Sequence, residues 1–586
     1  MKFLGNVLAT IVGLFVFCLL FLFGIVFISV LFGGDSDLTT VKKNSVIELN
    51  LTDIENDYGG KYKDPLMTFF SDNNEIGLTD IIDAIEAAKT DNDIKGISIL
   101  NNNSSLGIAQ SKSLRDALED FKKSGKFIMA YSNTYSQKEY YLNSVANTIY
   151  LNPVGEMNFK GLSSEILFFK DLQEKTGVKM EVIRHGKYKS AVEPFLDNKM
   201  SEANREQITE LLSSVWNTIV SDISKSRNIP ITKLNEIANN LLARTPILAK
   251  ENKLIDKIGY EDEYHDALKK TLKVKKDEDY NSISIINYTK KVNLDKEFEE
   301  KNNQIAVIYA QGEIQSGEGD VNTIGELSMN RSLQEARKDK KIKAIVLRID
   351  SPGGNALTSD LIWREIELTK KVKPVIVSMG NYAASGGYYI ACNANQIFAE
   401  KNTITGSIGV FGILPNFHQL STKIGIDVEQ VKTHENASEY SPFVPINETF
   451  KAVTIENVEH IYKTFVTHVA QGRKMTFAEV DAVAQGRVWT GTQALKIGLV
   501  DKIGNLNDAI KAAAKLAKTE DYSTKNFPEF EKSFDDILSK IPFGQSKAAF
   551  IKEEIGTENY KIIQQIKRLQ NRKGIQAIMP YEITIE

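Results

Sequence analysis

Apolar and polar residues follow a recurring order along this chain: a short run rich in β-branched residues, then a stretch with helical spacing, then another apolar run. This order occurs twice. The predicted strands lie at residues 46–51, 96–100 and 127–130, and again at 304–309, 344–347 and 375–378. Strands that alternate with helical periods predict a parallel sheet covered by helices, so the expected fold class is α/β.

The two occurrences align with one another at a constant offset of 248 residues. Identical pairs include Asn133 and Asn381, Tyr140 and Tyr388, Asn147 and Asn395, Ser190 and Ser438, and Pro194 and Pro442. One offset that holds over more than a hundred residues indicates a duplicated domain. We expect a first repeat at 45–290 and a second at 300–520, with the charged stretch 270–279 as a linker and 521–586 as a C-terminal extension.

The repeats differ at the positions that carry chemistry. Ser385 of the second repeat aligns with Gln137 of the first, and Lys189 of the first aligns with Ala437 of the second. The run Asp-Ser-Pro-Gly-Gly at 350–354 also occurs only in the second repeat. One repeat therefore offers a hydroxyl nucleophile and a glycine turn, and the other offers an amine. This complementary pattern predicts a Ser–Lys dyad split between two domains.

Each of these signals has an ordinary structural reading as well. Gly353 and Gly354 could turn backbone N–H groups toward an oxyanion, or simply connect a strand to the helix predicted at 357–370. Ser385 precedes Gly386 and could be a nucleophile or a helix N-cap. Lys189 has small and apolar neighbours that favour burial, and a lysine acts as a base only when burial or a nearby cation lowers its pKa.

The remaining reactive residues form no recognisable site. The six histidines are scattered, without a His-Glu-x-x-His run, so neither a metal nor another cofactor is expected. His185 lies four residues before Lys189, which leaves a Ser–His arrangement open. Cys18 and Cys392 are too few for a disulfide framework or a multi-cysteine metal site. The net charge is −4, without the excess of positive charge that is typical of nucleic-acid-binding proteins, so nucleic acid is not an expected partner.

The N-terminal residues 7–32 form an apolar, uncharged run. At about 1.5 Å of helical rise per residue, this run can cross a hydrocarbon core of about 30 Å. A cleavable signal has a shorter apolar core of about 7–15 residues, so an uncleaved transmembrane anchor at 1–33 is favoured. Lys2 flanks one side and Lys42 and Lys43 the other, and this near balance does not fix the orientation.

Four sequence blocks together resemble the signal peptide peptidase A family in its long, duplicated bacterial form. The blocks are Tyr-Lys-Ser-Ala-Val-Glu-Pro-Phe at 188–195, Asp-Ser-Pro-Gly-Gly at 350–354, Asn-Tyr-Ala-Ala-Ser-Gly-Gly-Tyr at 381–388 and Thr-Gly-Ser-Ile-Gly-Val-Phe-Gly at 405–412. The resemblance implies two tandem Clp-protease/crotonase-like repeats behind the N-terminal transmembrane helix. It implies a homotetramer in the bacterial inner (cytoplasmic) membrane, with one span and the catalytic body in the periplasm.

The resemblance also implies the roles of the site residues. Ser385 would be the nucleophile and Lys189 the general base, with Ser407 hydrogen-bonded to the lysine. The expected oxyanion donors are the backbone N–H groups at Gly354 and Gly386. The implied substrates are cleaved signal peptides and other unfolded apolar peptides. The alternative is a membrane-tethered scaffold or acyl-thioester-binding protein, because a glycine turn on a crotonase-like fold also serves thioester chemistry.

Overall fold

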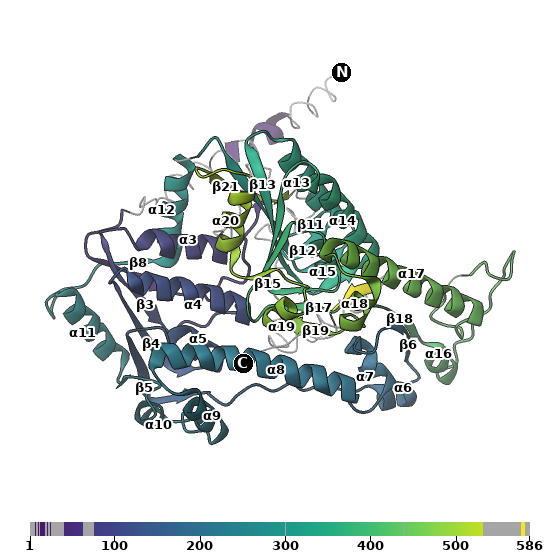
Figure 1. The fold of residues 1–586 in the computed structure, drawn as a ribbon, viewed down its shortest axis with the longest axis horizontal. Helices are drawn as coiled ribbons and strands as arrows, with labels where there is room; N and C mark the ends of the chain where they lie inside the picture. The colour runs from purple at the N-terminus through teal and green to yellow at the C-terminus, as the bar shows by residue number, and fades with distance from the viewer. Residues whose placement is uncertain are drawn as a thin grey trace.

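The computed structural model describes residues 40–62, 76–298, 300–438, 440–530 and 576–579, together with scattered positions between 6 and 24. Each half of the chain builds one large sheet, and the two halves lie side by side (Figure 1). The predicted anchor at 7–32 falls mostly outside the described residues. Among the residues that are described, no helix has the length and apolar character needed to cross a membrane.

The first half contains a six-stranded parallel sheet in the order β7-β5-β4-β3-β1-β8. Its strands are β1 (Ser45–Leu49), β3 (Ile94–Leu100), β4 (Phe127–Tyr135), β5 (Thr148–Met157), β7 (Lys257–Ile258) and β8 (Ser282–Ser284). The helices packed with it include α3 (Leu78–Ala88), α4 (Ile108–Lys123) and α8 (Glu202–Arg227). The three strands predicted here from the sequence are confirmed: those at 96–100 and 127–130 lie within β3 and β4, and the one at 46–51 overlaps β1, which ends at Leu49.

The second half repeats this order in an eight-stranded sheet, β19-β17-β15-β13-β9-β21, in which β16 also pairs with β15 and β20 pairs with β16. Its strands are β9 (Gln304–Gln311), β13 (Ile342–Ser351), β15 (Val375–Ala384), β16 (Gln396–Ala399), β17 (Ile404–Gly406), β19 (Val488–Thr490), β20 (Lys502–Ile503) and β21 (Ser523–Phe527). All residues of β9 are buried, as in a strand whose two faces are covered. The matching strand orders confirm the duplicated α/β fold.

A third sheet joins the halves. It runs β11-β12-β10-β14-β23-β18-β6 and contains β6 (Lys179–His185) from the first half. The other strands are β10 (Glu313–Gln315), β11 (Gly319–Asp320), β12 (Thr323–Gly325), β14 (Gly353–Asn355), β18 (Val410–Asn416) and β23 (Gln576–Ile578). β6 pairs antiparallel with β18 along its whole length, so main-chain bonds cross from one half to the other.

Two sequence-based boundaries differ from the structure. The stretch 270–279 is not a linker between the halves, because it connects α11 (Glu261–Leu272) to β8, which returns to pair with β1. The halves are instead joined by α12 (Ile285–Phe298), which leads into β9. The second sheet also extends past residue 520, because β21 finds main-chain partners on β9.

The C-terminal extension is described in part. From its apolar pattern the sequence also predicts helices at 530–539 and 558–569 and a strand at 581–585. Apart from Phe530, these segments lie outside the described residues. The described portion contains β23, a strand that the sequence did not predict.

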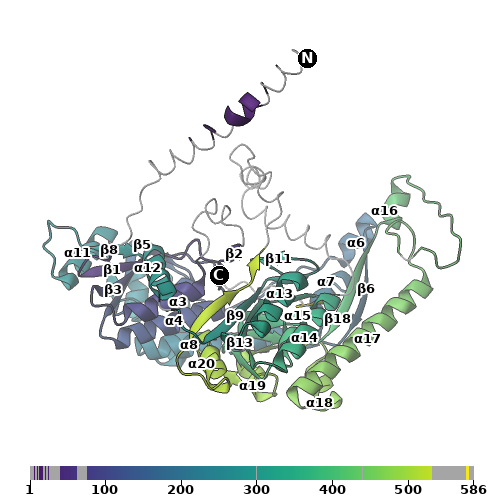
Figure 2. The same ribbon diagram turned by 90° about the horizontal axis from the view of Figure 1, so that it is seen from above.

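The long helix α8 runs under both halves (Figure 1). Its Ser214 hydroxyl lies 2.9 Å from the hydroxyl of Thr490 on β19 of the second half. An arm built from β6, β18, α16 (His418–Lys423) and α17 (Glu448–Arg473) projects from the body, as Figure 2 shows from above. The arm contains strands from both halves, and the turn that follows β6 carries Lys189.

Candidate active site

The structure brings Lys189 and Ser385 together across the junction of the two halves. Lys189 Nζ lies 2.9 Å from Ser385 Oγ and 3.0 Å from Ser407 Oγ. It also lies 3.1 Å from the Ser407 carbonyl oxygen. All three residues are completely buried. A nucleophile–base pair within hydrogen-bond distance, held by a third group, is the arrangement that activates a weak nucleophile.

Main-chain contacts with the second half fix the position of Lys189. The turn after β6 begins at Gly186, whose φ of 112° favours glycine. The backbone N–H of Tyr188 then donates to the Gln485 carbonyl at 2.8 Å. A Cβ on Gly486 would stand 2.7 Å from the backbone nitrogen of Lys189. The absence of a side chain at Gly486 therefore lets the two segments approach closely enough to place the amine.

Burial lowers the pKa of Lys189 well below its ordinary value of 10.5. No carboxylate forms an ion pair with this lysine within the described parts of the chain, and its nearest ring is Phe411, 5.8 Å from Nζ to the centroid. A charged amine without a counter-ion is costly in an apolar site. The neutral amine is consequently the favoured form, which is the form that can accept a proton.

Ser385 sits between β15 and α15 (Gly386–Ala391) with φ 54° and ψ −115°. A non-glycine residue in this region stores strain, which is typical of functional positions. The Ser385 N–H donates to the Gly406 carbonyl at 2.8 Å, which anchors the turn to β17. Its side chain makes no capping hydrogen bond to α15. Ser385 thus stands at the N-cap position of α15, but its hydroxyl does not cap the helix and lies 2.9 Å from Lys189 Nζ instead.

The predicted glycine turn lies directly beside Ser385. Gly353 and Gly354 have φ of 103° and 156°. A Cβ on Gly353 would stand 2.8 Å from the Gly386 nitrogen, and one on Gly386 would stand 3.2 Å from the Gly354 nitrogen. The backbone nitrogens of Gly354 and Gly386 thus border the same small space. A side chain on Gly354 would collide with the Ile314 carbonyl at 2.1 Å, so this conformation requires glycine.

A buried polar network behind the turn escaped the sequence analysis. The carboxylate of Asp350 accepts hydrogen bonds from the Tyr382 N–H at 2.9 Å and from Asn381 Nδ2 at 2.8 Å. On the same strand, Arg348 forms an ion pair of 2.6 Å with Asp57 of the first half. Burial, with a smaller contribution from Asp57, raises the pKa of Asp350 to about 7. The sequence did contain one sign of this network, because Arg348 interrupts an otherwise apolar stretch of β13.

The same network reaches the helix α4 of the first half. Asn381 Oδ1 accepts hydrogen bonds from the Ala109 and Gln110 N–H groups, each at 3.1 Å. The first turn of a helix has unpaired N–H donors, and here a side chain from the other repeat satisfies them. A Cβ on Gly107 would stand 2.4 Å from Asn381, so the contact is close.

The alternative base, His185, points away from the dyad. Its Nδ1 lies 2.6 Å from Glu459 Oε1, and its ring stacks on Tyr462 with centroids 3.7 Å apart. The amine beside Ser385 is that of Lys189, whereas the amine of Lys187, two residues earlier, is exposed. Within the described residues, no cluster of three or more histidine, cysteine, aspartate or glutamate side chains could hold a metal ion.

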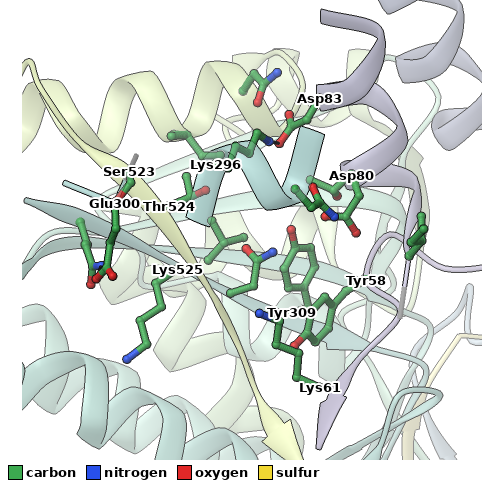
Figure 3. A pocket seen from close by; sticks show the side chains of 18 of the residues that line it. Tyr58, Lys61, Asp80, Asp83, Lys296, Glu300, Tyr309, Ser523, Thr524 and Lys525 are labelled. Atoms are coloured by element: carbon green, nitrogen blue, oxygen red, sulfur yellow. Dashed lines mark hydrogen bonds and ion pairs between the residues drawn. The ribbon is translucent and has the colours of Figure 1, made fainter. Parts of the chain in front are cut away.

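A separate cavity of about 1090 Å³ lies between α3, α12 and β21 (Figure 3). Tyr58 and Tyr309 stack in it with centroids 4.6 Å apart, and Lys296 reaches across toward Asp83. Charges of both signs line this cavity, and none of the predicted site residues does. It does not belong to the Ser–Lys centre.

Peptidase family S49 matches the chain at residues 120–275 and 367–520, one segment in each half. Protease 4 of Haemophilus influenzae is 36% identical over 80% of this chain and 77% of that protein. The chain belongs to peptidase family S49. The chloroplastic serine protease SPPA of Arabidopsis thaliana is 34% identical over 86% of this chain and 74% of that protein.

The solved structure of ClpP1 from Listeria monocytogenes covers 34% of this chain and 92% of its own, with 17% identity and a TM-score of 0.22. That score is too low to support an argument. The family and these relatives show that this chain is a serine protease of the signal peptide peptidase A type. They therefore favour the protease over the alternative of a thioester-binding protein.

Proposed function

We propose that this serine protease cleaves peptide bonds with Ser385 as the nucleophile and Lys189 as the general base. The observation that supports the proposal most strongly is the contact of 2.9 Å between the buried amine of Lys189 and Ser385 Oγ. Because burial lowers the pKa of this amine well below 10.5, the neutral form that can accept a proton is favoured over that of an exposed lysine.

The reaction proceeds in two halves. The neutral amine of Lys189 takes the Ser385 proton as Oγ attacks the carbonyl carbon of the peptide bond. The protonated amine then gives this proton to the leaving nitrogen, and an ester between Ser385 and the acyl part remains. In the second half, Lys189 takes a proton from water, the water oxygen attacks the ester, and Ser385 recovers its proton as the acid product leaves.

The negative charge that develops on the carbonyl oxygen needs hydrogen-bond donors. The backbone N–H groups of Gly354 and Gly386 border one space next to Ser385, and fixed donors of this kind stabilise an oxyanion without reorganisation. Ser407 supports the base, since its hydroxyl and carbonyl oxygens both lie within 3.1 Å of Lys189 Nζ.

The proposed substrates are cleaved signal peptides and other unfolded apolar peptides. The apolar run at 7–32 would tether the catalytic body to the inner membrane, with the body in the periplasm. Apolar residues from both halves surround the dyad, and a tethered enzyme meets membrane-derived peptides first. Protease added to spheroplasts should then digest the body, and its protection until the inner membrane is broken would reverse the orientation.

We also propose that identical chains form a closed ring, a homotetramer. Within the chain, β6 of the first half pairs with β18 of the second. At the repeat offset of 248 residues, the equivalents of these strands are 427–433 and 162–168. Both equivalents are without strand structure here, and Val431 and Leu167 are exposed. In the ring, residues 162–168 of one copy would therefore pair with residues 427–433 of the next copy.

A serine-reactive phosphonate tests the catalytic roles directly. We expect the wild type to be labelled at Ser385, and Ser385→Ala to be neither labelled nor active on an apolar reporter peptide. Lys189→Ala should lose a factor of about 10²–10⁴ in rate, the usual value of general-base assistance. The double variant should be no worse than either single one, because the pair acts as a unit. More than about a tenth of the wild-type rate in Lys189→Ala would contradict the assignment of the base.

A further inference from the structure

A short strand of the chain's own C-terminal region lies beside the dyad. β23 is inserted between β14, the glycine turn, and β18, and it runs antiparallel to both. Its register aligns Ala577 with Gly354 and Ile578 with Gly353. The next residue continues the contact, because the Met579 N–H donates to the Pro352 carbonyl at 2.6 Å. Residues 576–579 are therefore held as an added strand against the turn that carries the proposed oxyanion donors.

The carbonyl of Ala577 faces the glycines of the site. Its oxygen lies 2.1 Å from the position that a Cβ on Gly353 would take, and 3.1 Å from the corresponding position on Gly386. This is the space bordered by the Gly354 and Gly386 nitrogens. A substrate carbonyl has to occupy that space for Ser385 to attack it. The bond in the position of a scissile bond is consequently Ala577–Ile578.

The two residues after this bond fill apolar pockets. Ile578 is 3% exposed and packs with Val192 and Phe411. Met579 is 6% exposed and packs in a second pocket. That pocket is formed by Leu211, Ala384, Ile404 and Val488. Each pocket combines residues of the first half with residues of the second, as the dyad itself does.

The segment passes through the site and does not end there. Residues 580–586 follow Met579, so the site contains an internal peptide bond of the kind that an endopeptidase cuts. Ala577 is 1% exposed, and Ser385 and Lys189 are fully buried with the segment in place. A substrate therefore has to displace residues 576–579 before it can reach the nucleophile.

We propose that residues 576–579 are an internal occupant of the substrate groove, and that substrates bind as the same added strand. The register then assigns the specificity: a small residue before the cleaved bond, and large aliphatic residues at both positions after it. The first of these enters the pocket of Val192 and Phe411, and the second enters the pocket of Leu211 and Val488. The inference rests on the proposed peptidase function, and it adds the substrate preference and a competitor within the chain.

A binding experiment separates this inference from catalysis. The full chain with Ser385→Ala is compared with the same chain that also has Ile578→Asp and Met579→Asp, changes that place charges in both apolar pockets. The probe is a fluorescein-labelled peptide with the sequence of residues 572–583, measured by anisotropy. We expect the chain with the two aspartates to bind this peptide at least about tenfold more tightly, a difference of about 1.4 kcal/mol. Equal binding by the two chains would overturn the proposal that residues 576–579 occupy the substrate groove.

Two controls keep that result specific. Val372→Asp in the Ser385→Ala chain adds a charge at an exposed residue before β15, at the strand end opposite Ser385, and should leave binding unchanged. Ala577→Arg vacates the groove by bulk and should reproduce the gain, which excludes an effect of acidic charge or of misfolding in one variant. Failure of Ala577→Arg to increase binding would also overturn the proposal.

Cleavage of matched peptides tests the pockets. In the active full chain, the peptide of residues 572–583 should be cut after alanine, as read by mass spectrometry. Replacing its isoleucine or its methionine with aspartate should raise KM about tenfold or more with a smaller change in kcat. Leu211→Ala enlarges the second pocket and should shift the preference from methionine to phenylalanine at that position. Cleavage at another bond, or an unchanged KM for both aspartate-containing peptides, would overturn the assignment of the two pockets even if Ser385 proves to be the nucleophile.

Discussion

At the scale of single residues, this site stores energy that a purely structural arrangement would avoid. Lys189 is a fully buried amine without a carboxylate partner in the described part of the chain. Ser385 has a backbone conformation that costs free energy for any residue except glycine. Both features are required if a neutral amine is to meet the serine hydroxyl at 2.9 Å. Active sites commonly trade stability for such geometry.

The first prediction concerns Lys189→Met. The folded-state pKa of Lys189 lies well below 10.5, so between these two values the unfolded chain binds one more proton than the folded chain. Stability that depends on Lys189 therefore rises with pH and falls as the pH is lowered through this window. Lys189→Met has no such dependence. We expect the melting temperature of the variant, relative to the wild type, to increase as the pH falls from about 10 to 7.

Lys187→Met is the matched control, since Lys187 is exposed two residues away. Its melting temperature should follow that of the wild type at every pH. A constant difference between Lys189→Met and the wild type over the whole range would mean that Lys189 is charged in the folded protein, contrary to its assigned role.

The second prediction concerns the pH dependence of activity. Because the lowered pKa of Lys189 belongs to a base, the active form is the deprotonated one. The rate should rise with pH through this pKa and reach its optimum at neutral to alkaline pH, measured as kcat/KM on a reporter peptide. An optimum below about pH 6 would contradict a lysine base.

EDTA should leave the rate unchanged, and activity restored by zinc after EDTA would indicate a metal site.

At the scale of elements, the strand ends that form the site are held by buried polar contacts between the halves. Arg348 on β13 pairs with Asp57, and it also donates to the Ser378 hydroxyl and the Met379 carbonyl on β15, both at 2.9 Å. Asn381 beyond them caps α4. The strand that leads to the nucleophile is thus tied to the half that supplies the base.

The third prediction follows from this pairing. Asp57→Ala leaves a buried guanidinium without its counter-ion, which costs about 3–5 kcal/mol. We expect that loss in the free energy of unfolding by urea, together with a lower kcat because β15 is displaced. Asp53→Ala, at an exposed position nearby, should have no effect on either quantity. Asp57→Leu combined with Arg348→Met should recover most of the stability, and a loss equal to the sum of the single changes would show that the pair is not coupled.

The sequence predicted the elements whose signal is local. The apolar strands and the helix after the glycine turn were found from periodicity, and α14 (Ala356–Lys370) begins one residue before the prediction. Lys189 and Ser385 were found because each repeat lacks what the other has. Asp57 and Asn381 were missed because their partners lie in the other half, at sequence separations of 291 and 271 residues. β23 was missed for the same reason, since three residues form a strand only between β14 and β18.

At the scale of the whole molecule, the duplication would make two kinds of junction in the proposed ring. The junction within the chain joins Lys189 to Ser385. The equivalent junction between chains would bring Ala437 to Gln137, which lack both the amine and the hydroxyl. Gln137 instead accepts hydrogen bonds from the Lys160 and Gly161 N–H groups, at 3.1 and 2.9 Å. The proposed ring would therefore have alternating active and inactive junctions, with one active site per chain.

The fourth prediction uses the register of β6 and β18 to place the contact between chains. Within the chain, Gly412 pairs with Ile183. The repeat offset converts this pair into Ser164 of one copy and Val431 of the next. In a chain whose Cys18 is replaced by serine, Ser164→Cys and Val431→Cys together should give disulfide-linked multimers on a non-reducing gel after mild oxidation. Each single variant should stay unlinked, because Cys392 is buried.

The register itself supplies the control for that experiment. Ser164→Cys with Asp427→Cys displaces the second cysteine by four residues, about 13 Å along an extended strand, which is beyond the reach of a disulfide. If the shifted pair links as well as the aligned one, the chains meet at random and the ring is wrong. If the aligned pair links and light scattering of the untreated protein gives four chains, the strand pairing that builds the active junction inside one chain also closes the inactive junctions between chains.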